Sequence, residues 1–234
     1  MTTRRTMLRA LAGAALLPAG LQAAPAFAAA AAGANESLKD IARRKGMRFG
    51  TALGAGPKQL GDAAYRALVE RECGLIVAEN EMKWQAIEPA KGKLQFRAAD
   101  TLLAWASSHD IAMRGHNLFW QTEKWLPHWV AGEDFGADPR AAVERLMREH
   151  VRSECEHFGK AIGSWDVVNE AVDPADGKLR QNVLTRPLGA IEQIDLAFRL
   201  AKEYAPHAQL VYNDYMRADQ GSVRHRAGVL QLLG

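Results

Sequence analysis

The stretch Trp165-Asp166-Val167-Val168-Asn169-Glu170 decides how the rest of the chain is interpreted. It is an apolar run rich in β-branched residues, which is typical of a strand, and it ends abruptly in an amide and a carboxylic acid. In a parallel α/β barrel the reacting groups lie at the carboxyl ends of the strands, so Asn169 and Glu170 are expected to face a cleft. Taken alone, however, a solvated glutamate that opens a loop is the simpler interpretation.

Other expected strands end in the same kind of polar cluster. These clusters are Glu79 with Asn80, His116 with Trp120, and Asn213 with Asp214. Scattered surface polarity would not choose the same end of each strand. The recurrence therefore favours a shared cleft, to which each strand contributes polar groups.

Strand and helix patterns alternate along the chain. The expected strands are Met47–Leu53, Leu75–Ala78, Ile111–Trp120, Ile162–Val168 and Gln209–Tyr212, and the expected helices are Asp62–Arg71, Ala98–Ser108, Pro139–His157, Ile191–Tyr204 and Val223–Leu233. This alternation predicts an α/β fold with a parallel sheet, namely about five of the eight β/α units of a (β/α)8 TIM barrel, and hence an open, incomplete barrel. An open doubly wound sheet is the alternative, but no glycine-rich phosphate loop follows the first strand.

The first 28 residues have the features of a twin-arginine signal peptide. Arg4 and Arg5 precede a weakly apolar segment that ends in a small-residue cleavage site at Ala26-Phe27-Ala28. Pro18 and two glycines interrupt this segment, which makes a membrane anchor the weaker alternative. We expect export to the periplasm or medium, a spacer and an N-terminal helix over residues 29–46, and one barrel domain over residues 47–234.

Charge and cysteine content exclude several classes of protein. The net charge is +3, but removal of residues 1–28 takes away three arginines and no acids, which leaves equal numbers of basic and acidic residues. A nucleic-acid partner therefore loses its main support, and no membrane partner is expected after signal removal. Cys73 and Cys155 lack metal-ligand spacing, so we expect unpaired thiols in helical surroundings. Nothing in the sequence implies a metal or a cofactor.

Tryptophans accompany the polar clusters. The chain has six tryptophans, of which Trp84, Trp120, Trp125 and Trp129 are expected in or beside the loops at the same end of the sheet. Flat aromatic faces beside carboxylates and amides suit sugar rings, which have an apolar C–H face and a rim of hydroxyls. Trp105, within an expected helix, is assigned to core packing.

Three motifs carry a resemblance to a known family. They are Glu79-Asn80-Glu81-Met82-Lys83-Trp84, Arg114-Gly115-His116-Asn117-Leu118-Phe119-Trp120, and Trp165 to Glu170 followed by Ala171, with support from Val211 to Tyr215. With these motifs in this order, the chain after about Met47 resembles glycoside hydrolases of family 10, the endo-1,4-β-xylanases. The resemblance implies hydrolysis, with retention, of β-1,4-xylosidic bonds in xylan or xylo-oligosaccharides.

The resemblance also implies roles for individual residues. Glu170 would be the general acid/base, Asn169 would hold the sugar 2-hydroxyl, His116 and Lys83 would bind hydroxyls above a floor that includes Trp120, and Glu79 and Asn80 would grip the next xylose on the non-reducing side. Structural alternatives remain for three of these residues: a core histidine at His116, a solvated turn lysine at Lys83, and a helix cap at Glu79. Asp214 is assigned a structural role.

The chain departs from the family at two points. Where the third-strand motif usually ends Trp-His, this chain has Trp120-Gln121. A retaining glycosidase also needs a second carboxylate ~5 to 5.5 Å from the acid/base, and the family motif that supplies it, like Ile-Thr-Glu-Leu-Asp, does not occur here. We therefore expect no nucleophile in this chain and no activity as it stands. The alternatives are a non-catalytic xylan-binding remnant, or another (β/α)8 glycosidase such as a β-1,4-glucanase.

Overall fold

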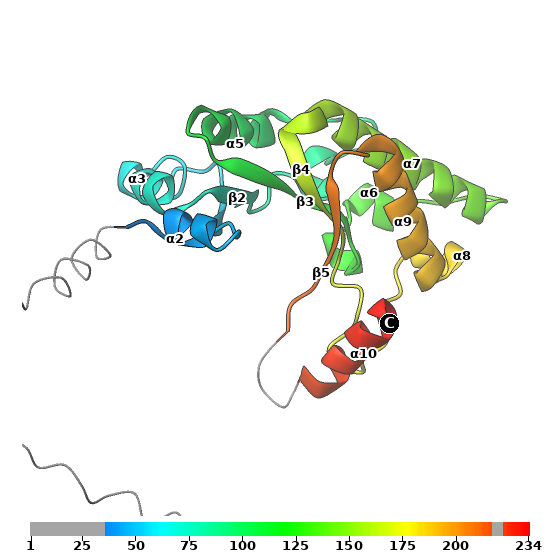
Figure 1. Cartoon of the computed structure of the whole chain (residues 1–234). Helices are drawn as coiled ribbons and strands as arrows, with labels where there is room; N and C mark the ends of the chain where they lie inside the picture. The colour runs from blue at the N-terminus through cyan, green and yellow to red at the C-terminus, as the bar shows by residue number, and fades with distance from the viewer. Residues whose placement is uncertain (1–35, 217–221) are drawn as a thin grey trace, which may run out of the picture. The chain divides into compact units, whose positions relative to one another are not determined.

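The computed structural model describes residues 36–216 and 222–234, so the expected signal peptide lies outside the described residues. The strands are β1 (Gly50–Leu53), β2 (Leu75–Ala78), β3 (Ala112–Trp120), β4 (Ile162–Asn169) and β5 (Gln209–Asn213). The longer helices are α2 (Leu38–Arg44), α3 (Ala63–Glu72), α5 (Arg97–Ser108), α7 (Pro139–Phe158), α9 (Ala190–Tyr204) and α10 (Val223–Leu233) (Figure 1). The predicted α/β alternation is confirmed.

The strands form one parallel sheet in the order β1-β2-β3-β4-β5. Each strand therefore lies beside its neighbour in sequence, as in a (β/α)8 barrel. In a doubly wound sheet the order of the strands would reverse at a switch point. No such reversal occurs among these five strands, so that alternative is wrong. Within the described residues β1 and β5 pair on one side each, which makes the five β/α units an open part of a barrel, as predicted.

Local side-chain chemistry sets the starts of several helices. The Asp62 carboxylate accepts hydrogen bonds from the backbone N–H groups of Ala64 and Tyr65 and so caps α3. Asp138 caps α7 in the same way, and proline occupies the first position of that helix. Ser37 caps α2, the helix expected within residues 29–46. These contacts satisfy backbone donors that have no partner inside a helix.

Two kinds of difference separate the prediction from the structure. The first strand begins at Gly50 instead of Met47, and the sequence pattern did not predict five short helical segments. These are α4 (Trp84–Ile87), η1 (Glu123–Trp125), α6 (His128–Ala131), η2 (Gly159–Ala161) and α8 (Thr185–Leu188). Segments of one turn are too short to show a helical repeat of apolar residues, which explains why they were missed.

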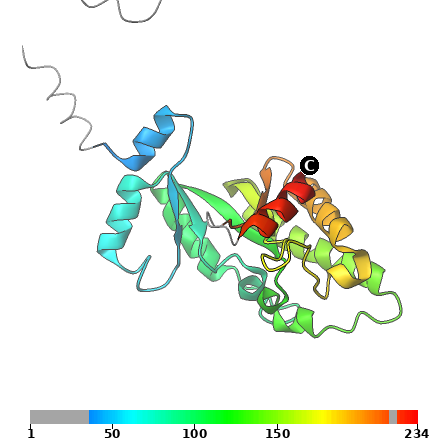
Figure 2. The same ribbon diagram turned by 90° about the horizontal axis from the view of Figure 1, so that it is seen from below.

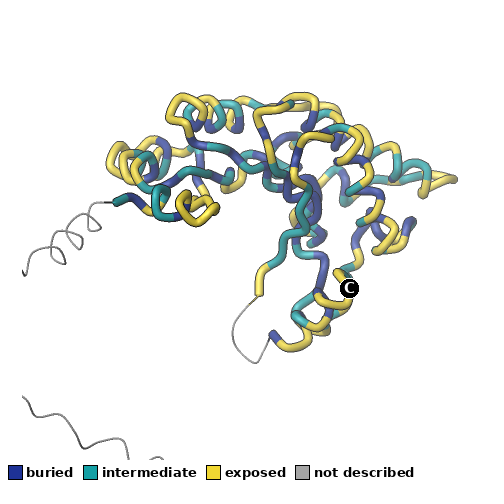
Figure 3. Tube along the Cα trace, viewed as in Figure 1, coloured by how far each residue is buried: buried dark blue, intermediate teal, exposed yellow. Residues whose placement is uncertain are grey.

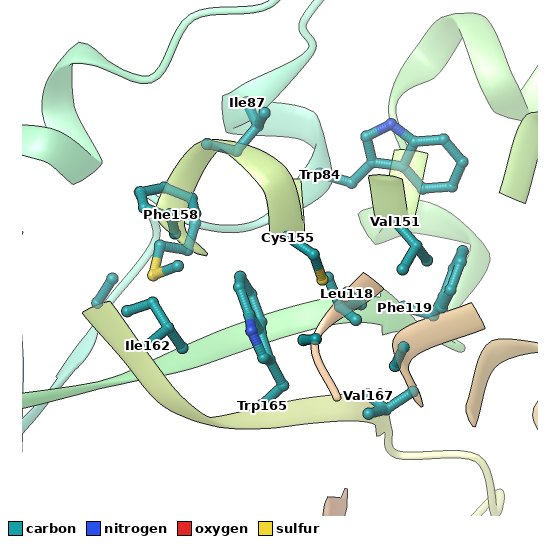
Figure 4. Close-up of a cluster of buried hydrophobic side chains, with 14 of the residues drawn as sticks. Trp84, Ile87, Leu118, Phe119, Val151, Cys155, Phe158, Ile162, Trp165 and Val167 are labelled. Atoms are coloured by element: carbon teal, nitrogen blue, oxygen red, sulfur yellow. The ribbon is translucent and has the colours of Figure 1, made fainter. Parts of the chain in front are cut away.

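The core lies between the central strands and the helices that cover them. Figure 3 shows burial concentrated along β3 and β4, and Figure 4 shows Trp165 pointing from β4 toward Cys155 and Phe158 of α7. A Cβ at position 115 would lie only 2.2 Å from the Trp165 ring. Glycine on β3 therefore lets the largest core side chain lie across the neighbouring strand.

Helix α10 lies against the loop that follows β4 (Figure 2). A Cβ at Gly228 would be 2.1 Å from the carbonyl oxygen of Gly177, so the two backbones approach as closely as glycine permits. Cys73 and Cys155 are buried and unpaired, as predicted, and burial raises the pKa of both thiols. Across the described residues, the helices include none with the length and apolarity of a membrane span.

Candidate active site

The carboxyl ends of β3, β4 and β5 lie side by side. Trp120 is in register with Asn169, and Asn169 is in register with Asn213. Glu170 follows Asn169 directly, and its backbone N–H donates to the carbonyl of Asn213 at 2.9 Å. The parallel sheet thus brings together polar residues that are up to 93 positions apart, counted from Trp120 to Asn213.

Glu170 is held at both its backbone and its side chain. Its φ angle is 57°, in the left-handed region, and the guanidinium of Arg180 donates from Nε to its carbonyl oxygen at 3.0 Å. The indole Nε1 of Trp120 donates to Oε2 of its carboxyl group at 3.0 Å. The side chain is half-buried. This fixes one carboxyl oxygen inside the protein, while no side chain of the described residues hydrogen-bonds to Oε1.

Asn169 is buried beside this carboxyl group. Its Oδ1 accepts a hydrogen bond from Nδ2 of Asn213 at 2.8 Å, and its backbone carbonyl accepts one from the N–H of Gln121 at 3.0 Å. Because Oδ1 already has a partner within the protein, the Nδ2 group is the one that remains to donate to a ligand.

Lys83 joins the residues after β2 to the carboxyl ends of β3, β4 and β5, and these strand ends together are called the rim below. Its ammonium donates to Oδ1 of Asn80 at 2.9 Å and lies 4.6 Å from the ring centroid of Trp120. Burial lowers the pKa of Lys83, while the nearby carboxylates of Glu79, Glu81 and Glu170 act in the opposite direction. The lysine is half-buried and bonded, so a freely solvated turn lysine is not what the structure has.

Glu79 is exposed and is positioned from the loop after β1. Its Oε2 accepts a hydrogen bond from Nε2 of Gln59 at 2.5 Å. It does not cap α4, whose N-cap residue is Lys83 and lacks a side-chain cap. Glu81, for which the sequence predicted no role, accepts a hydrogen bond from the backbone N–H of Ala55 at 2.6 Å and so ties the loop after β2 to the loop after β1.

His116 is oriented by an acid on the next strand. Its Nδ1 lies 2.9 Å from Oδ2 of Asp166, and the two residues are in register across β3 and β4. Arg114 contacts the other oxygen of the same carboxylate. The His116 side chain retains 17% exposure, so it is not a fully enclosed core histidine. No local pattern in the sequence pointed to a role for Asp166 or Arg114, although alternation along β3 places Arg114 and His116 on one face.

The comparisons with known proteins agree with this geometry. Residues 37–233 match the model of a family described as Glycosyl hydrolase family 10. The chain belongs to glycosyl hydrolase family 10.

Individual family 10 relatives are similar over most of the chain. Endo-1,4-beta-xylanase 3 of Hypocrea jecorina is 37% identical over 193 residues, which is 81% of this chain and 53% of that protein. Endo-1,4-beta-xylanase 1 of Humicola insolens is 37% identical over 80% of this chain and 42% of its own length. This chain thus spans about half the length of the curated relatives it matches.

Solved structures give the same family and fold. Xylanase 10B from Thermotoga petrophila RKU-1, solved in complex with xylobiose, superposes with a TM-score of 0.74 at 28% identity, over 85% of this chain and 58% of that one. Native xylanase 10B from Thermotoga maritima has a TM-score of 0.73 at 30% identity over 84% and 58%. The incomplete (β/α)8 barrel predicted from the sequence is confirmed.

The four tryptophans expected at the rim of this family 10 chain divide into two pairs. Trp120 and Trp125 stack with ring centroids 5.0 Å apart, and Trp125 is exposed. Trp84 is buried instead, stacks on His150 at 3.9 Å, and packs edge-on against Trp129. Trp84 lies in the connection after β2, as expected, but the one-turn helix α4 directs its ring inward and away from any sugar.

Gln121, the departure from the Trp-His pattern of the family, lies in a buried amide cluster. Its Nε2 donates to Oε1 of Gln193 on α9 at 2.7 Å, and its Oε1 accepts from Nδ2 of Asn182 at 2.9 Å. The cluster links the end of β3 to α9 and to the loop after β4. An amide can donate and accept at once, which is what these two partners require.

Asp214 has structural partners. It accepts a hydrogen bond from the Tyr212 hydroxyl and lies 3.1 Å from Nε2 of His225 on α10. The pKa of Tyr212 is raised mainly by burial and, to a smaller extent, by the hydrogen bond from its hydroxyl to Asp214. Within residues 36–216 and 222–234, no group of three or more His, Cys, Asp or Glu side chains is arranged to hold a metal ion.

Proposed function

We propose that this chain supplies the general acid/base, Glu170, and sugar-binding groups of an endo-1,4-β-xylanase. The complete enzyme binds the xylan backbone and cleaves its β-1,4-xylosidic bonds with retention. The observation that carries the proposal is the fixed carboxyl group of Glu170. It lies at the end of β4, in contact with Trp120, in a chain of family 10.

The proposed role of Glu170 is to protonate the glycosidic oxygen. That oxygen is a poor leaving group until it receives a proton, which a carboxylic acid beside it supplies. The contact from Trp120 to Oε2 supports Oε1 as the oxygen that faces the substrate. The same group then removes a proton from the water that completes the reaction.

The remaining rim residues are proposed to hold the sugars. Nδ2 of Asn169 suits the 2-hydroxyl at the cleavage point, where a hydrogen bond strengthens as positive charge develops on the ring. Lys83 and His116 would bind hydroxyls of that sugar or its neighbour above the Trp120 ring. Glu79 and Asn80, both exposed, would grip the next xylose on the non-reducing side.

We further propose that the polypeptide of residues 1–234 by itself binds xylo-oligosaccharides without hydrolysing them. Retention needs a second carboxylate that forms the glycosyl-enzyme. The motif that carries it in the family does not occur in this sequence. The sugar-binding groups proposed above, by contrast, all lie within the described rim.

Calorimetric titration of the chain with xylotetraose, cellotetraose and mannotetraose tests the proposal. We expect binding of xylotetraose alone, loss of that binding in Lys83→Ala and His116→Ala, and no reducing sugar released from xylan. Leu230→Ala, on the exposed side of α10, is the control variant. Stronger binding of cellotetraose would favour a glucanase, and release of reducing sugar by the unaltered chain would place a nucleophile within it.

Export by the twin-arginine route is a separate proposal. It rests on Arg4 and Arg5 ahead of an apolar segment and a small-residue cleavage site. Replacement of both arginines by lysine should leave the precursor in the cytoplasm, as measured by fractionation and immunoblotting. Unchanged export of the double variant would contradict the proposal.

A further inference from the structure

Gln121 follows Trp120 directly after β3 and is buried there. The groups proposed to protonate or bind the sugar do not include it. Its side chain nevertheless makes two hydrogen bonds. Nε2 donates to Gln193 on α9 at 2.7 Å, and Oε1 accepts from Asn182 in the loop after β4 at 2.9 Å. A buried amide with partners on two other elements fixes the end of the strand that carries it.

The backbone of Gln121 is held on both sides as well. Its N–H donates to the carbonyl of Asn169 on β4 at 3.0 Å. Its carbonyl accepts a hydrogen bond from Nδ2 of Asn182 at 3.0 Å, so this one amide group contacts both the side chain and the backbone of Gln121. Because Trp120 is the preceding residue, these contacts fix the backbone from which its indole extends.

The loop after β4 reaches both groups that hold Glu170. Arg180 donates from Nε to the carbonyl of Glu170 at 3.0 Å, and Asn182, in the same stretch of this loop, holds the residue after Trp120. Trp120 itself donates from Nε1 to Oε2 of Glu170 at 3.0 Å. A single stretch of the loop therefore sets the position of the carboxyl group and of the indole that orients it.

Asn182 is itself held in place. Its Oδ1 accepts hydrogen bonds from the backbone N–H groups of Leu184 and Thr185 at 2.9 and 3.0 Å. Its own N–H donates to the hydroxyl of Thr185 at 2.8 Å. All three residues are buried. The Nδ2 group is thus aimed at Gln121 by a buried turn, which limits its freedom to reorient.

A role in stability alone does not account for this amide cluster. Nε2 of Gln193 is buried and has no hydrogen-bond partner within the described residues. A buried donor without a partner destabilises the fold, whereas apolar side chains in the same space would not have this disadvantage. A cluster that lowers stability in this respect, but fixes a residue of the site, fits a positioning role.

We propose that Gln121 is a positioning residue, which keeps the indole of Trp120 on the carboxyl group of Glu170. It does so through its contacts with Asn182 and Gln193. The inference rests on the proposed function, in which Glu170 is the acid, and adds to it the contacts that orient this acid. Since Gln121 is buried, its effect on a bound sugar passes through Trp120.

The indole N–H signal of Trp120 in a proton–nitrogen NMR spectrum tests the proposal, because it reports the hydrogen bond to Glu170. Trp120→Phe identifies the signal, and Glu170→Ala gives its position without the carboxyl group. Gln121→Met removes both side-chain contacts at similar size. We expect it to move the signal most of the way to the Glu170→Ala position and to weaken binding of xylotetraose about fivefold.

A conservative variant should rescue both properties. At about pH 8 the imidazole of Gln121→His is neutral, so one nitrogen donates and the other accepts, as the amide does. We expect the Trp120 signal and the affinity for xylotetraose to return close to those of the unaltered chain. Failure of a folded Gln121→His to restore the signal would contradict the assignment of these two contacts as the cause.

Asn182→Asp is a second variant, in case Gln121→Met fails to fold. It keeps the oxygen that accepts from the following turn and replaces only the Nδ2 donor, so it should move the same signal. Val69→Ala, a buried change on α3, controls for loss of stability. It should make the chain easier to unfold in urea and leave the Trp120 signal in place.

The remaining outcomes separate the inference from the proposed function. A Trp120 signal that stays in place in folded Gln121→Met would overturn the inference and leave the proposed function standing. If neither Gln121→Met nor Asn182→Asp folds, the cluster serves stability and the inference is likewise wrong. Failure of the unaltered chain to bind xylotetraose would overturn the proposed function, whereas the Trp120 signal would still decide whether Gln121 orients the indole.

Discussion

Two glutamates in this chain, Glu170 at the rim of the sheet and Glu154 inside α7, have opposite surroundings. Glu170 is half-buried and has a donor on its carboxyl group, a donor on its carbonyl and a neighbouring lysine. Glu154 is fully buried, and neither of its carboxyl oxygens has a hydrogen-bond partner within the described structure. Glu170 can therefore exchange a proton with a ligand, whereas the burial of Glu154 lowers the stability of the folded state.

The neighbour of Glu154 does not relieve this cost. Nε2 of His150 lies 3.6 Å from Oε1 of Glu154, but the same nitrogen donates to the Leu118 carbonyl at 2.8 Å. Burial lowers the pKa of His150 to about 3. Burial, and to a lesser degree the nearby Glu88 carboxylate, raises the pKa of Glu154 well above its ordinary value. Both side chains are therefore neutral over much of the pH range, and their proximity is not a salt bridge.

The hydrogen-bond partners of a carboxyl group, and not the residue type, therefore decide whether it can exchange a proton with a ligand. A carboxylate with fixed donors and access to solvent can exchange a proton with a ligand. A carboxyl group enclosed by apolar side chains keeps its proton and weakens the fold by the free energy of that burial.

The largest effect should come from Glu170. In a form of the protein that hydrolyses xylan, we expect Glu170→Ala to lower the rate on xylan about 10³-fold, because the general acid is lost. Aryl xylobiosides whose leaving group needs no proton should be affected far less, as measured by release of the aryl group. Equal losses on the two substrates would contradict the acid role. The free energy of unfolding should change little, since Glu170 has solvent access.

Glu154 should behave in the opposite way. We expect Glu154→Val to raise the free energy of unfolding at pH 7 by about 1 to 3 kcal/mol, because an apolar side chain needs no partner there. Urea denaturation measures this change, and the affinity for xylo-oligosaccharides should stay the same. Loss of stability would instead indicate that Glu154 and His150 form a stabilising ion pair.

The pH dependence of stability should report the same buried group. In the folded state the pKa of Glu154 lies well above its ordinary value of 4.5, so the folded state binds this proton more tightly than the unfolded state does. The folded state therefore loses stability as pH rises above 4.5 toward the raised pKa. Glu154→Gln cannot lose a proton and escapes this loss. We expect the stability advantage of Glu154→Gln to grow by up to about 1.4 kcal/mol per pH unit in that window.

His150 should have the opposite trend and serves as the control. It binds its proton more weakly when folded, so stability falls as pH drops from 6.5 toward about 3, in the variant and the unaltered chain alike. Urea denaturation from pH 4 to pH 8 separates the two trends. A difference between the two proteins that stays constant with pH would contradict the raised pKa of Glu154.

Arg180 tests how much the rim depends on its supports. Its Nε donates to the carbonyl of Glu170, and its Nη1 donates to Asp173 at 2.8 Å. Lysine cannot make both contacts with this geometry. In a form of the protein that hydrolyses xylan, Arg180→Lys should therefore lower kcat about fivefold with little change in KM. Arg199→Lys, on an exposed ion pair within α9, is the matched control. A change in KM alone would mean that Arg180 contacts the ligand.

The smallest effect sets the baseline. Leu230 on α10 is 68% exposed, so Leu230→Ser should change the free energy of unfolding by less than about 0.5 kcal/mol. Urea denaturation checks this. A clear loss of stability would show that α10 buries Leu230 against another surface in solution.

The strand ends show how far the sequence determined the site. The β-branched run before Asn169 and Glu170, together with strands and helices in alternation, predicted a parallel sheet. Parallel strands bring their carboxyl ends to one edge whatever the packing above them. For that reason the neighbourhood of Trp120, Asn169 and Asn213 could be predicted before the structure was known.

Only the tertiary structure decided which neighbours each side chain has. The ring of Trp84 is buried because α4, too short to predict, turns it toward His150. Gln121 finds Asn182 and Gln193 because the loop after β4 and helix α9 both reach the end of β3. Periodicity along a strand or helix specifies which face a residue lies on. Long-range packing specifies what that face meets, and contacts between residues 60 or 70 positions apart leave no local pattern in the sequence.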